Sequence, residues 1–417
     1  MKQDNESDLT RAAQGPDGEP VRLSIDGQLM SALLRSMGEP PVRIELWNGD
    51  EVGCTKGKEV ARIRIANRKS LLKLVVDPEF QFGECFTEGT LRVEGDLVKL
   101  LAVLMRGLNK YTSAVRQFID WSRRRHTNTV ADSRDNIHAH YDLGNDFYKL
   151  WLDPQLAYTC AYFPTPSTTL AAAQVAKMDL VCRKLRLQPG ETVVEAGCGW
   201  GALALHMAAN FGVKVKAFNI SHEQMEYARQ RARAEGLGDC VEFIEDDYRN
   251  ISGNFDAFVS VGMLEHVGRE NYRELGTIID KALSTNGRGL IHSIGLVRPA
   301  PLNAWIERRI FPGANPPSLR EMLEVLEVPG FSVLDVENLR LHYALTLKYW
   351  RENYENAIAE VTRMYGEKFV RIWRVYLSGS QAAFETGQLQ LFQVVFARQY
   401  TNEVPWTRGY LYGQEAA

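Results

Sequence analysis

Three glycines spaced two apart mark the stretch of the sequence best suited to holding a ligand. Gly197, Gly199 and Gly201 lie in the run 195–201, EAGCGWG. A Pro-Gly turn signal and two valines precede this run and predict a buried strand, and the residues after it have the apolar spacing of a helix. Glycines at such a junction let the backbone approach a ligand at the helix N-terminus. Residues 191–206 therefore predict a strand, a binding turn and a helix.

Charge around this turn separates two classes of ligand. The turn would also suit a dinucleotide, with Ala202 in the place of the last glycine of that fingerprint. Glu195, however, would repel a pyrophosphate, whereas a carboxylate attracts the ammonium or sulfonium group of S-adenosylmethionine. The next predicted strand, 213–218, ends in Asn219 and lacks the acidic residue that the ribose of a nicotinamide cofactor usually requires. The pattern favours S-adenosylmethionine, and a turn that serves only close helix packing stays open as the alternative.

The composition is that of an ordinary globular protein. The chain has 417 residues, of which 45% are hydrophobic and 24% are charged, so we expect two domains or one enlarged domain with ample core. The net charge of −3 gives no bulk basicity for nucleic acid binding, and any contact with a membrane must be local. The polar start of the chain is unlike a secretory signal, and no apolar run approaches the length needed to cross a bilayer.

The cysteines and histidines do not form a pattern typical of metal binding. The six cysteines are scattered without a Cys-x-x-Cys pair, which favours reduced thiols in a cytoplasm over disulfides or zinc. His138 and His140 lie two apart, but no carboxylate pattern completes a site around them. We therefore expect no metal.

The N-terminal part of the chain predicts a small α+β domain over 21–120. Residues 1–20 are rich in acidic residues, Gly and Pro and are expected to be a disordered tail. Alternating apolar residues predict strands at 43–47, 61–65, 71–75 and 91–96, and an apolar run predicts a helix at 97–108. The charged and polar residues 121–135 are expected to be a linker, whose three-arginine run is either a solvated face or a contact with anionic head groups.

Over residues 136–417, predicted strands and helices alternate as a doubly wound sheet requires. After the strand at the glycine turn, six more segments have strand character: 213–218, 240–244, 255–261, 289–294, 332–336 and 391–396. Seven strands with a glycine turn after the first match a class I methyltransferase, a Rossmann-like α/β fold that binds cofactor and substrate at the C-terminal ends of its strands.

Seven short stretches, in order along the chain, resemble the cyclopropane-fatty-acyl-phospholipid synthase family, which is related to the enzymes that modify mycolic acids. The stretches are 136–146 (NIHAHYDLGND), 158–162 (YTCAY), 195–201 (EAGCGWG), 220–224 (ISHEQ), 247–249 (DYR), 260–268 (SVGMLEHVG) and 292–295 (HSIG). The resemblance covers roughly residues 90 to 400, so it is far more specific than any single motif.

This resemblance implies an S-adenosylmethionine-dependent C-methyltransferase that acts on lipid. Such an enzyme transfers a methylene carbon to the cis double bond of an unsaturated acyl chain in a membrane phospholipid, and a cyclopropane forms. The resemblance also implies a lipid-associated N-terminal domain and a cytoplasmic protein that is peripheral on the inner face of the membrane. A homodimer is a further expectation, and a nucleic acid partner is not expected.

The chemistry of this family requires a base. An alkene attacks the sulfonium methyl group in a dry pocket, and the resulting cation must lose a proton from the new methyl group before the ring closes. In the family a bound bicarbonate is taken to be that base, and the matching positions that would hold it here are Cys160, Glu265, His292, Tyr343 and the backbone of Ile294. Glu265 and His292 are expected to follow the ends of the fourth and fifth strands.

Each of these positions has a structural alternative. Cys160 could be an inert buried thiol and His292 a core histidine, while His266 could be a polar group at a helix start. Tyr343 has an adjacent rival in His342.

Cofactor contacts are expected from four parts of the sequence. In chain order they are Tyr158 and Thr159 over the methionine end, Gly197 and Gly199 beside it, Asn219 and Gln224 at the ribose, and Asp247 and Tyr248 at the adenine. The amphipathic segment 305–311 is either a lid over an apolar acyl tunnel or an ordinary surface helix.

Two alternatives to a cyclopropane product stay open. The same cation could lose a different proton and give a methylene- or methyl-branched chain, or the substrate could be the conjugated precursor of a furan lipid. The alternative from another class is a non-catalytic lipid-binding protein on a methyltransferase fold.

Overall fold

The computed structural model describes residues 23–53, 59–108 and 143–412. The chain divides into two compact units, Met1–Trp121 and Ser122–Ala417. The expected tail (1–20) and linker (121–135) lie outside the described residues, together with the two neighbouring histidines considered for a metal.

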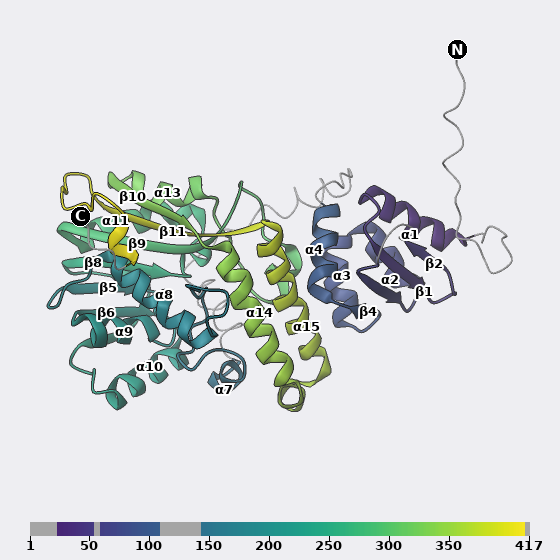
Figure 1. Cartoon of the computed structure of the whole chain (residues 1–417), viewed down its shortest axis with the longest axis horizontal. Coiled ribbons are helices and arrows are strands. Elements are labelled where there is room, and N and C mark those ends of the chain that lie inside the picture. Colours follow the sequence, from purple (N-terminus) through teal and green to yellow (C-terminus); the bar gives the residue numbers. More distant parts are fainter. Residues whose placement is uncertain (1–22, 54–58, 109–142, 413–417) are drawn as a thin grey trace, which may run out of the picture. The chain divides into compact units, whose positions relative to one another are not determined.

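The first unit is an α+β domain on a four-stranded sheet with the order β2-β1-β3-β4 (Figure 1). Its elements are α1 (Ile25–Ser36), β1 (Val42–Leu46), β2 (Glu51–Gly53), β3 (Ala61–Ile65), α2 (Arg68–Val76), α3 (Pro78–Thr87), β4 (Leu91–Gly95) and α4 (Leu97–Leu108). Strands β1 and β3 run parallel, and the other neighbours run antiparallel. Alternate residues of β1 and β3 are buried, which is the period of two that predicted these strands.

The segment 71–75, predicted to be a strand, lies inside helix α2, so this prediction was wrong. Leu71 and Leu74 are buried while Leu72 is 44% exposed, which is the spacing of a helix face. The Asn67 side chain caps the helix by accepting a main-chain N–H at 2.9 Å. Five residues are too few to separate the two periods, and the asparagine cap was the signal that could have separated them.

The second unit is built on a seven-stranded sheet with the order β10-β11-β9-β8-β5-β6-β7 (Figure 1). The strands are β5 (Thr192–Ala196), β6 (Lys214–Asn219), β7 (Val241–Glu245), β8 (Phe255–Val261), β9 (Leu283–Leu296), β10 (Phe331–Asn338) and β11 (Leu389–Arg398). Strand β11 runs antiparallel to both of its neighbours, and the other pairs are parallel. All seven predicted strands are present, and β9 begins earlier than the predicted residue 289.

Helices cover both faces of this sheet, so the expected Rossmann-like, doubly wound fold of a class I methyltransferase is confirmed. On one face, α8 (Leu170–Leu185), α9 (Ala202–Phe211) and α10 (His222–Ala234) share an apolar core with the sheet. On the other face, α11 (Tyr272–Ala282) and α13 (Leu319–Glu327) do the same. The switch in strand order at β5 and β8 places the glycine turn where such folds bind ligands.

A helical hairpin is inserted between β10 and β11. It consists of α14 (Arg340–Asn356) and α15 (Ile358–Thr386), and the short helix α7 (Asn145–Lys149) packs against it through Phe147, whose ring lies 5.1 Å from that of Trp373. A further short helix, α12 (Ala304–Arg309), follows β9. Within the three described ranges, no helix combines the length and the apolar character needed to span a membrane.

Candidate active site

All three glycines of the turn after β5 have positive φ angles, and the surroundings of Gly199 and Gly201 differ. Gly199 and Gly201 have φ angles of +54° and +79°, in the left-handed region that favours glycine. A Cβ atom on Gly201 would lie 2.6 Å from the ring of Phe243, so this glycine lets α9 pack closely on the sheet. A Cβ atom on Gly199 would meet no described atom within 4 Å. The packing alternative thus accounts for Gly201, whereas the space at Gly199 is open to a ligand.

The residues expected at the ribose meet beside this turn. Asn219, the last residue of β6, donates through Nδ2 to the carbonyl oxygen of Gly199 at 3.3 Å and to Oε1 of Gln224 at 2.7 Å. These contacts fix both amides next to the open space at Gly199.

The residues expected at the adenine follow β7. Asp247 accepts the main-chain N–H of Arg249 at 2.9 Å and one guanidinium nitrogen of the same residue at 3.1 Å. The Arg249 guanidinium lies 4.9 Å from the ring centre of Tyr248. Burial raises the pKa of the Tyr248 hydroxyl, which has no hydrogen-bond partner within the described structure. Tyr248 therefore offers a neutral aromatic ring beside a carboxylate.

Glu195 interacts electrostatically with a buried lysine that the sequence did not reveal. Glu195 is 2% exposed, and burial raises the pKa of its carboxyl to about 8. Lys177 of α8 opposes this shift, while burial lowers the pKa of Lys177 itself. No partner for Glu195 Oε2 is found among the described residues. The attraction between Glu195 and a bound cofactor stays a prediction, because Lys177 already supplies a positive charge here.

Two polar side chains of α8 hold the loop that carries Tyr158, Thr159 and Cys160. Gln174 donates through Nε2 to the carbonyl oxygen of Thr159 at 2.9 Å. Lys177 donates through Nζ to Oγ1 of Thr159 at 3.0 Å. A hydrogen bond of 2.6 Å joins the hydroxyls of Tyr158 and Tyr376, so α15 fixes the loop from another side.

Glu265 is held in a 3-10 helix, Leu264–His266, that follows β8. Its Oε1 accepts the main-chain N–H of Ile294 at 2.6 Å, whereas Oε2 is buried and has no partner in the part of the chain described. Burial raises the pKa of Glu265 to about 7, and the bond from Ile294 opposes this shift. The structure brings Glu265 and Ile294 together as expected, but this N–H is already bonded to the carboxylate.

We expected His292 to follow the end of the fifth strand, but it lies inside β9. It pairs with Val261, the last residue of β8, so it is still at the C-terminal edge of the parallel strands. Its Nδ1 lies 3.0 Å from Nε2 of Gln393, and its own Nε2 is buried without a partner among the residues described. Burial lowers the pKa of His292 well below its usual value, so the ring is neutral.

Cys160 and Tyr343 come together through one carbonyl group. Cys160 is fully buried, and its Sγ donates to the carbonyl oxygen of Ala161 at 3.2 Å and lies 3.9 Å from that of Leu339. The Leu339 carbonyl also accepts the main-chain N–H of Tyr343 at 3.2 Å. Burial raises the pKa of Cys160, which therefore stays a neutral thiol donor.

His342, the rival of Tyr343, is occupied by other contacts. Its Nδ1 accepts the main-chain N–H of Phe163 at 3.0 Å, and its ring stacks on Tyr162 with 4.9 Å between the ring centres. Tyr343 instead stacks on Phe384 at 4.5 Å. These contacts favour Tyr343 for the site.

The segment 305–311 borders this site. Trp305 in α12 is buried, and the ring of Phe311 lies 5.8 Å from that of His266 and 5.7 Å from that of Tyr376. These contacts speak against an ordinary surface helix, and a lid over an acyl tunnel stays a prediction.

Sequence reasoning missed the buried polar residues of α8, Gln174, Lys177 and Lys184. Their spacings of three and seven place them on one helix face, which is otherwise apolar. Polar residues that recur at helical spacing on a buried face were the signal. Among the described residues, no group of three His, Cys, Asp or Glu side chains could hold a metal ion.

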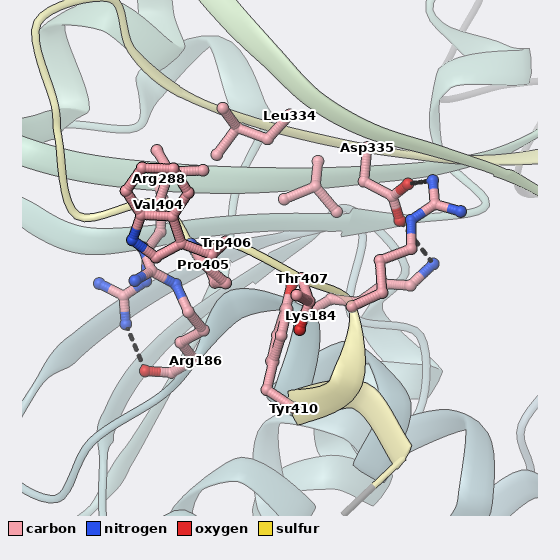
Figure 2. A pocket seen from close by; sticks show the side chains of 12 residues that line it. Lys184, Arg186, Arg288, Leu334, Asp335, Val404, Pro405, Trp406, Thr407 and Tyr410 are labelled. Atoms are coloured by element: carbon pink, nitrogen blue, oxygen red, sulfur yellow. Dashed lines mark hydrogen bonds and ion pairs between the residues drawn. The ribbon is translucent and has the colours of Figure 1, made fainter. Parts of the chain in front are cut away.

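A separate cavity of about 220 Å³ lies between the end of α8 and the C-terminal segment (Figure 2). Four cationic side chains line it, and three of them are paired: Lys184 with Glu337 at 2.5 Å, Arg288 with Glu191 at 2.7 Å, and Arg408 with Asp335. None of the predicted site residues lines this cavity, so it is distinct from the site around Glu265.

Comparisons with known proteins identify the family. Residues 128–394 match the family described as mycolic acid cyclopropane synthetase, and residues 29–114 match a domain of unknown function. A probable fatty acid methyltransferase of Pseudomonas putida is 37% identical over 89% of this chain and 96% of the relative. The cyclopropane-fatty-acyl-phospholipid synthase of Escherichia coli (strain K12) is 36% identical over 83% of this chain and 90% of the relative.

Solved structures agree with these matches. The mycolic acid cyclopropane synthase CmaA1, complexed with SAH and CTAB, is 30% identical with a TM-score of 0.61, and the alignment covers 64% of this chain and 98% of that chain. The cyclopropane synthase MmaA2 from Mycobacterium tuberculosis gives the same values. With its methyltransferase sheet, its glycine turn and these matches, the chain belongs to the cyclopropane synthase family.

Proposed function

We propose that this protein adds the methylene carbon of S-adenosylmethionine to the cis double bond of an unsaturated acyl chain in a membrane phospholipid and forms a cyclopropane ring. As a member of its family, the chain is an S-adenosylmethionine-dependent enzyme of the C-methyltransferase type that modifies lipid acyl chains. The non-catalytic alternative is therefore set aside. The observation that carries the finer proposal is the buried carboxyl of Glu265, with one oxygen bonded to Ile294 and the other without a described partner.

Burial of the reactive groups suits a carbocation. Cys160, Glu265 and His292 are each at most 5% exposed, so the site keeps out water that would trap the cation. An alkene is a weak nucleophile, and its attack depends on being held against the methyl group. We propose that Tyr158 and Thr159 contact the methionine end of the cofactor, and their hydrogen bonds to α15 and α8 support this by holding the loop in place.

The site also fits a small anion such as bicarbonate. Glu265 Oε2 and His292 Nε2 are both buried and lack partners among the described atoms, so each can bond to a ligand. Glu265, with a pKa of about 7, can accept a hydrogen bond or hold a proton near neutral pH. Cys160 carries a neutral thiol and Tyr343 a hydroxyl, and both groups can donate hydrogen bonds. When bound, bicarbonate would supply the base that removes the methyl proton.

We also propose that the enzyme works as a peripheral protein on the inner, cytoplasmic face of a membrane, where its first unit contacts phospholipid. The phospholipid named in the E. coli relative supports this substrate. A homodimer is compatible with this arrangement.

A labelling experiment tests the reaction. The protein is given vesicles of a cis-unsaturated phospholipid and S-adenosylmethionine with a trideuteromethyl group. Loss of one proton from the new methyl group should leave two deuteriums in the product, and proton NMR should show upfield ring signals. Retention of all three deuteriums would exclude a cyclopropane.

One alternative product has support of its own. The Pseudomonas putida relative is named a probable fatty acid methyltransferase, and its identity to this chain is as high as that of the E. coli relative. Vinylidene signals with two deuteriums would indicate a methylene branch, and three deuteriums would indicate a methyl branch.

A further inference from the structure

His292 and Gln393 are direct neighbours across two antiparallel strands. Residue 292 of β9 pairs with residue 393 of β11, so their side chains share one face of the sheet. Both side chains are buried, and Nε2 of Gln393 lies 3.0 Å from Nδ1 of His292. Because the two ring nitrogens of a neutral histidine differ, the partner of one nitrogen decides the role of the other.

Lys184 decides which way the Gln393 amide is turned. The Nζ atom of Lys184 lies 2.7 Å from Oε1 of Gln393, and an ammonium group can only donate. Lys184 is also 2.5 Å from Glu337 and 4.0 Å from Asp335, and these carboxylates oppose the lowering of its pKa by burial. The Gln393 oxygen must therefore face Lys184, which leaves the amide NH2 group facing His292.

Only one placement of the protons on Gln393 and His292 satisfies these contacts. An amide NH2 group has no lone pair to offer, so Nδ1 of His292 must accept from Gln393. A neutral ring that accepts at Nδ1 carries its proton on Nε2. That nitrogen is buried and unpaired within the structure described, so its N–H is available to a ligand.

We propose that Lys184 and Gln393 are positioning residues that hold His292 as the Nε2–H tautomer, so that the histidine acts as a hydrogen-bond donor in the active site. This inference rests on the proposed function, which places His292 in that site. A donor suits an anion that must keep its own basic oxygen free, because the opposite tautomer would present a lone pair to the anion and repel it.

The burial of Lys184 supports a role beyond stability. Its side chain is fully buried where α8 reaches the cavity of Figure 2, in which it points toward Asp335. A buried ion pair is often no more stabilising than apolar residues of the same volume. The position is therefore better explained by what the ammonium group orients, which is Gln393.

Nitrogen NMR of protein labelled with ¹⁵N-histidine tests the tautomer without turnover. The unmodified protein should show a protonated Nε2 and an unprotonated Nδ1 for His292, a signal identified by its loss in His292→Gln. A protonated Nδ1 in the unmodified protein, or rapid exchange between its tautomers, would overturn the proposal. Absence of a lipid product alongside the expected tautomer would count against the proposed function only.

Substitutions then test the two positioning residues. Gln393→Glu places a carboxylate at Nδ1, so Nδ1 should become protonated and kcat should fall at least about tenfold, with cofactor affinity within about twofold. Gln390→Glu is the matched control, because Gln390 is buried in the same strand but bonds to Asn338 at 2.8 Å. Lys184→Met combined with Glu337→Gln should mix the two tautomers, whereas Lys184→Arg, which keeps a donor cation at this position, should retain Nε2–H. An unchanged His292 signal in folded Gln393→Glu would contradict the proposal.

Discussion

Glu265 accepts the main-chain N–H of Ile294 at 2.6 Å through one oxygen and has no described partner at the other. One oxygen thus fixes the carboxyl group to β9, while the other is available for chemistry. Because Ile294 and His292 belong to the same strand, this bond also fixes Glu265 relative to the strand that carries the histidine.

Glu265→Gln should lower kcat by about a hundredfold or more, because the amide keeps the bond to Ile294 but cannot take up a proton. Cofactor affinity, measured by calorimetry, should stay within about twofold, since the loss falls on the transition state. Glu321→Gln is the matched control, because Glu321 is also a buried glutamate but caps α13 through Ser318. A rate within threefold of the unmodified enzyme would remove Glu265 from the mechanism.

The same carboxyl group makes stability depend on pH. Its pKa is about 7 in the folded protein against an ordinary 4.5, so the folded state binds this proton more tightly than the unfolded state does. The contribution of this bound proton to the free energy of unfolding is fully present below pH 4.5 and is lost as pH rises through 7. In carbonate-free buffer without cofactor, the unmodified protein should therefore lose on the order of 3 kcal/mol more than Glu265→Gln between these pH values. Urea unfolding at pH 4.5 and 7.5 measures this difference, and parallel pH curves for the two proteins would contradict it.

The sequence predicted the parts of the fold that local patterns determine. The seven strands of the catalytic unit follow from apolar runs bounded by turns, and Asn219 and Gln224 are brought together because one ends β6 and the other begins the next helix. The helix at Leu71 was missed because five residues do not separate a period of two from one of 3.6.

Contacts between distant segments could not be predicted in this way. Lys184 and Gln393 lie on α8 and β11, and only the folded sheet brings them to His292. Similarly, the hydrogen bond from the Ile294 N–H to Glu265 forms only in the folded chain and could not be read from the sequence.

Gly199→Val should lower affinity for S-adenosylmethionine more than tenfold, because a branched side chain would enter open space at the turn and strain a left-handed backbone. Gly236→Val is the control, since Gly236 has a φ of +70° and similarly open surroundings but lies in the loop after α10. Titration calorimetry on both variants separates the general effect of a strained backbone, which both share, from the loss of cofactor binding, which only Gly199→Val should show. Unchanged affinity in folded Gly199→Val would show that the cofactor does not bind at this turn.

The last prediction concerns the exposed face of α2 in the first unit. Leu72 and Val76 are 44% and 58% exposed there, and the exposed Lys69 and Lys73 lie three residues before each of them, at the spacing of one helix face. Two apolar side chains flanked by lysines are suited to an anionic phospholipid surface, since the apolar groups can enter the acyl region while the ammonium groups meet the head groups.

Replacing Leu72 and Val76 together by serine should therefore weaken binding to anionic vesicles roughly tenfold, because much of the apolar area that α2 would bury is removed. Vesicle sedimentation measures the affinity, and binding of the unmodified protein should fall as salt is added. Val328→Ser is the control, because Val328 is 53% exposed but lies at the end of α13 in the catalytic unit. Cofactor affinity should not change in either variant, since none of these positions is among the residues expected to contact the cofactor. If the serine variant sediments with vesicles as strongly as the unmodified protein does, α2 is not the surface through which the first unit meets the membrane.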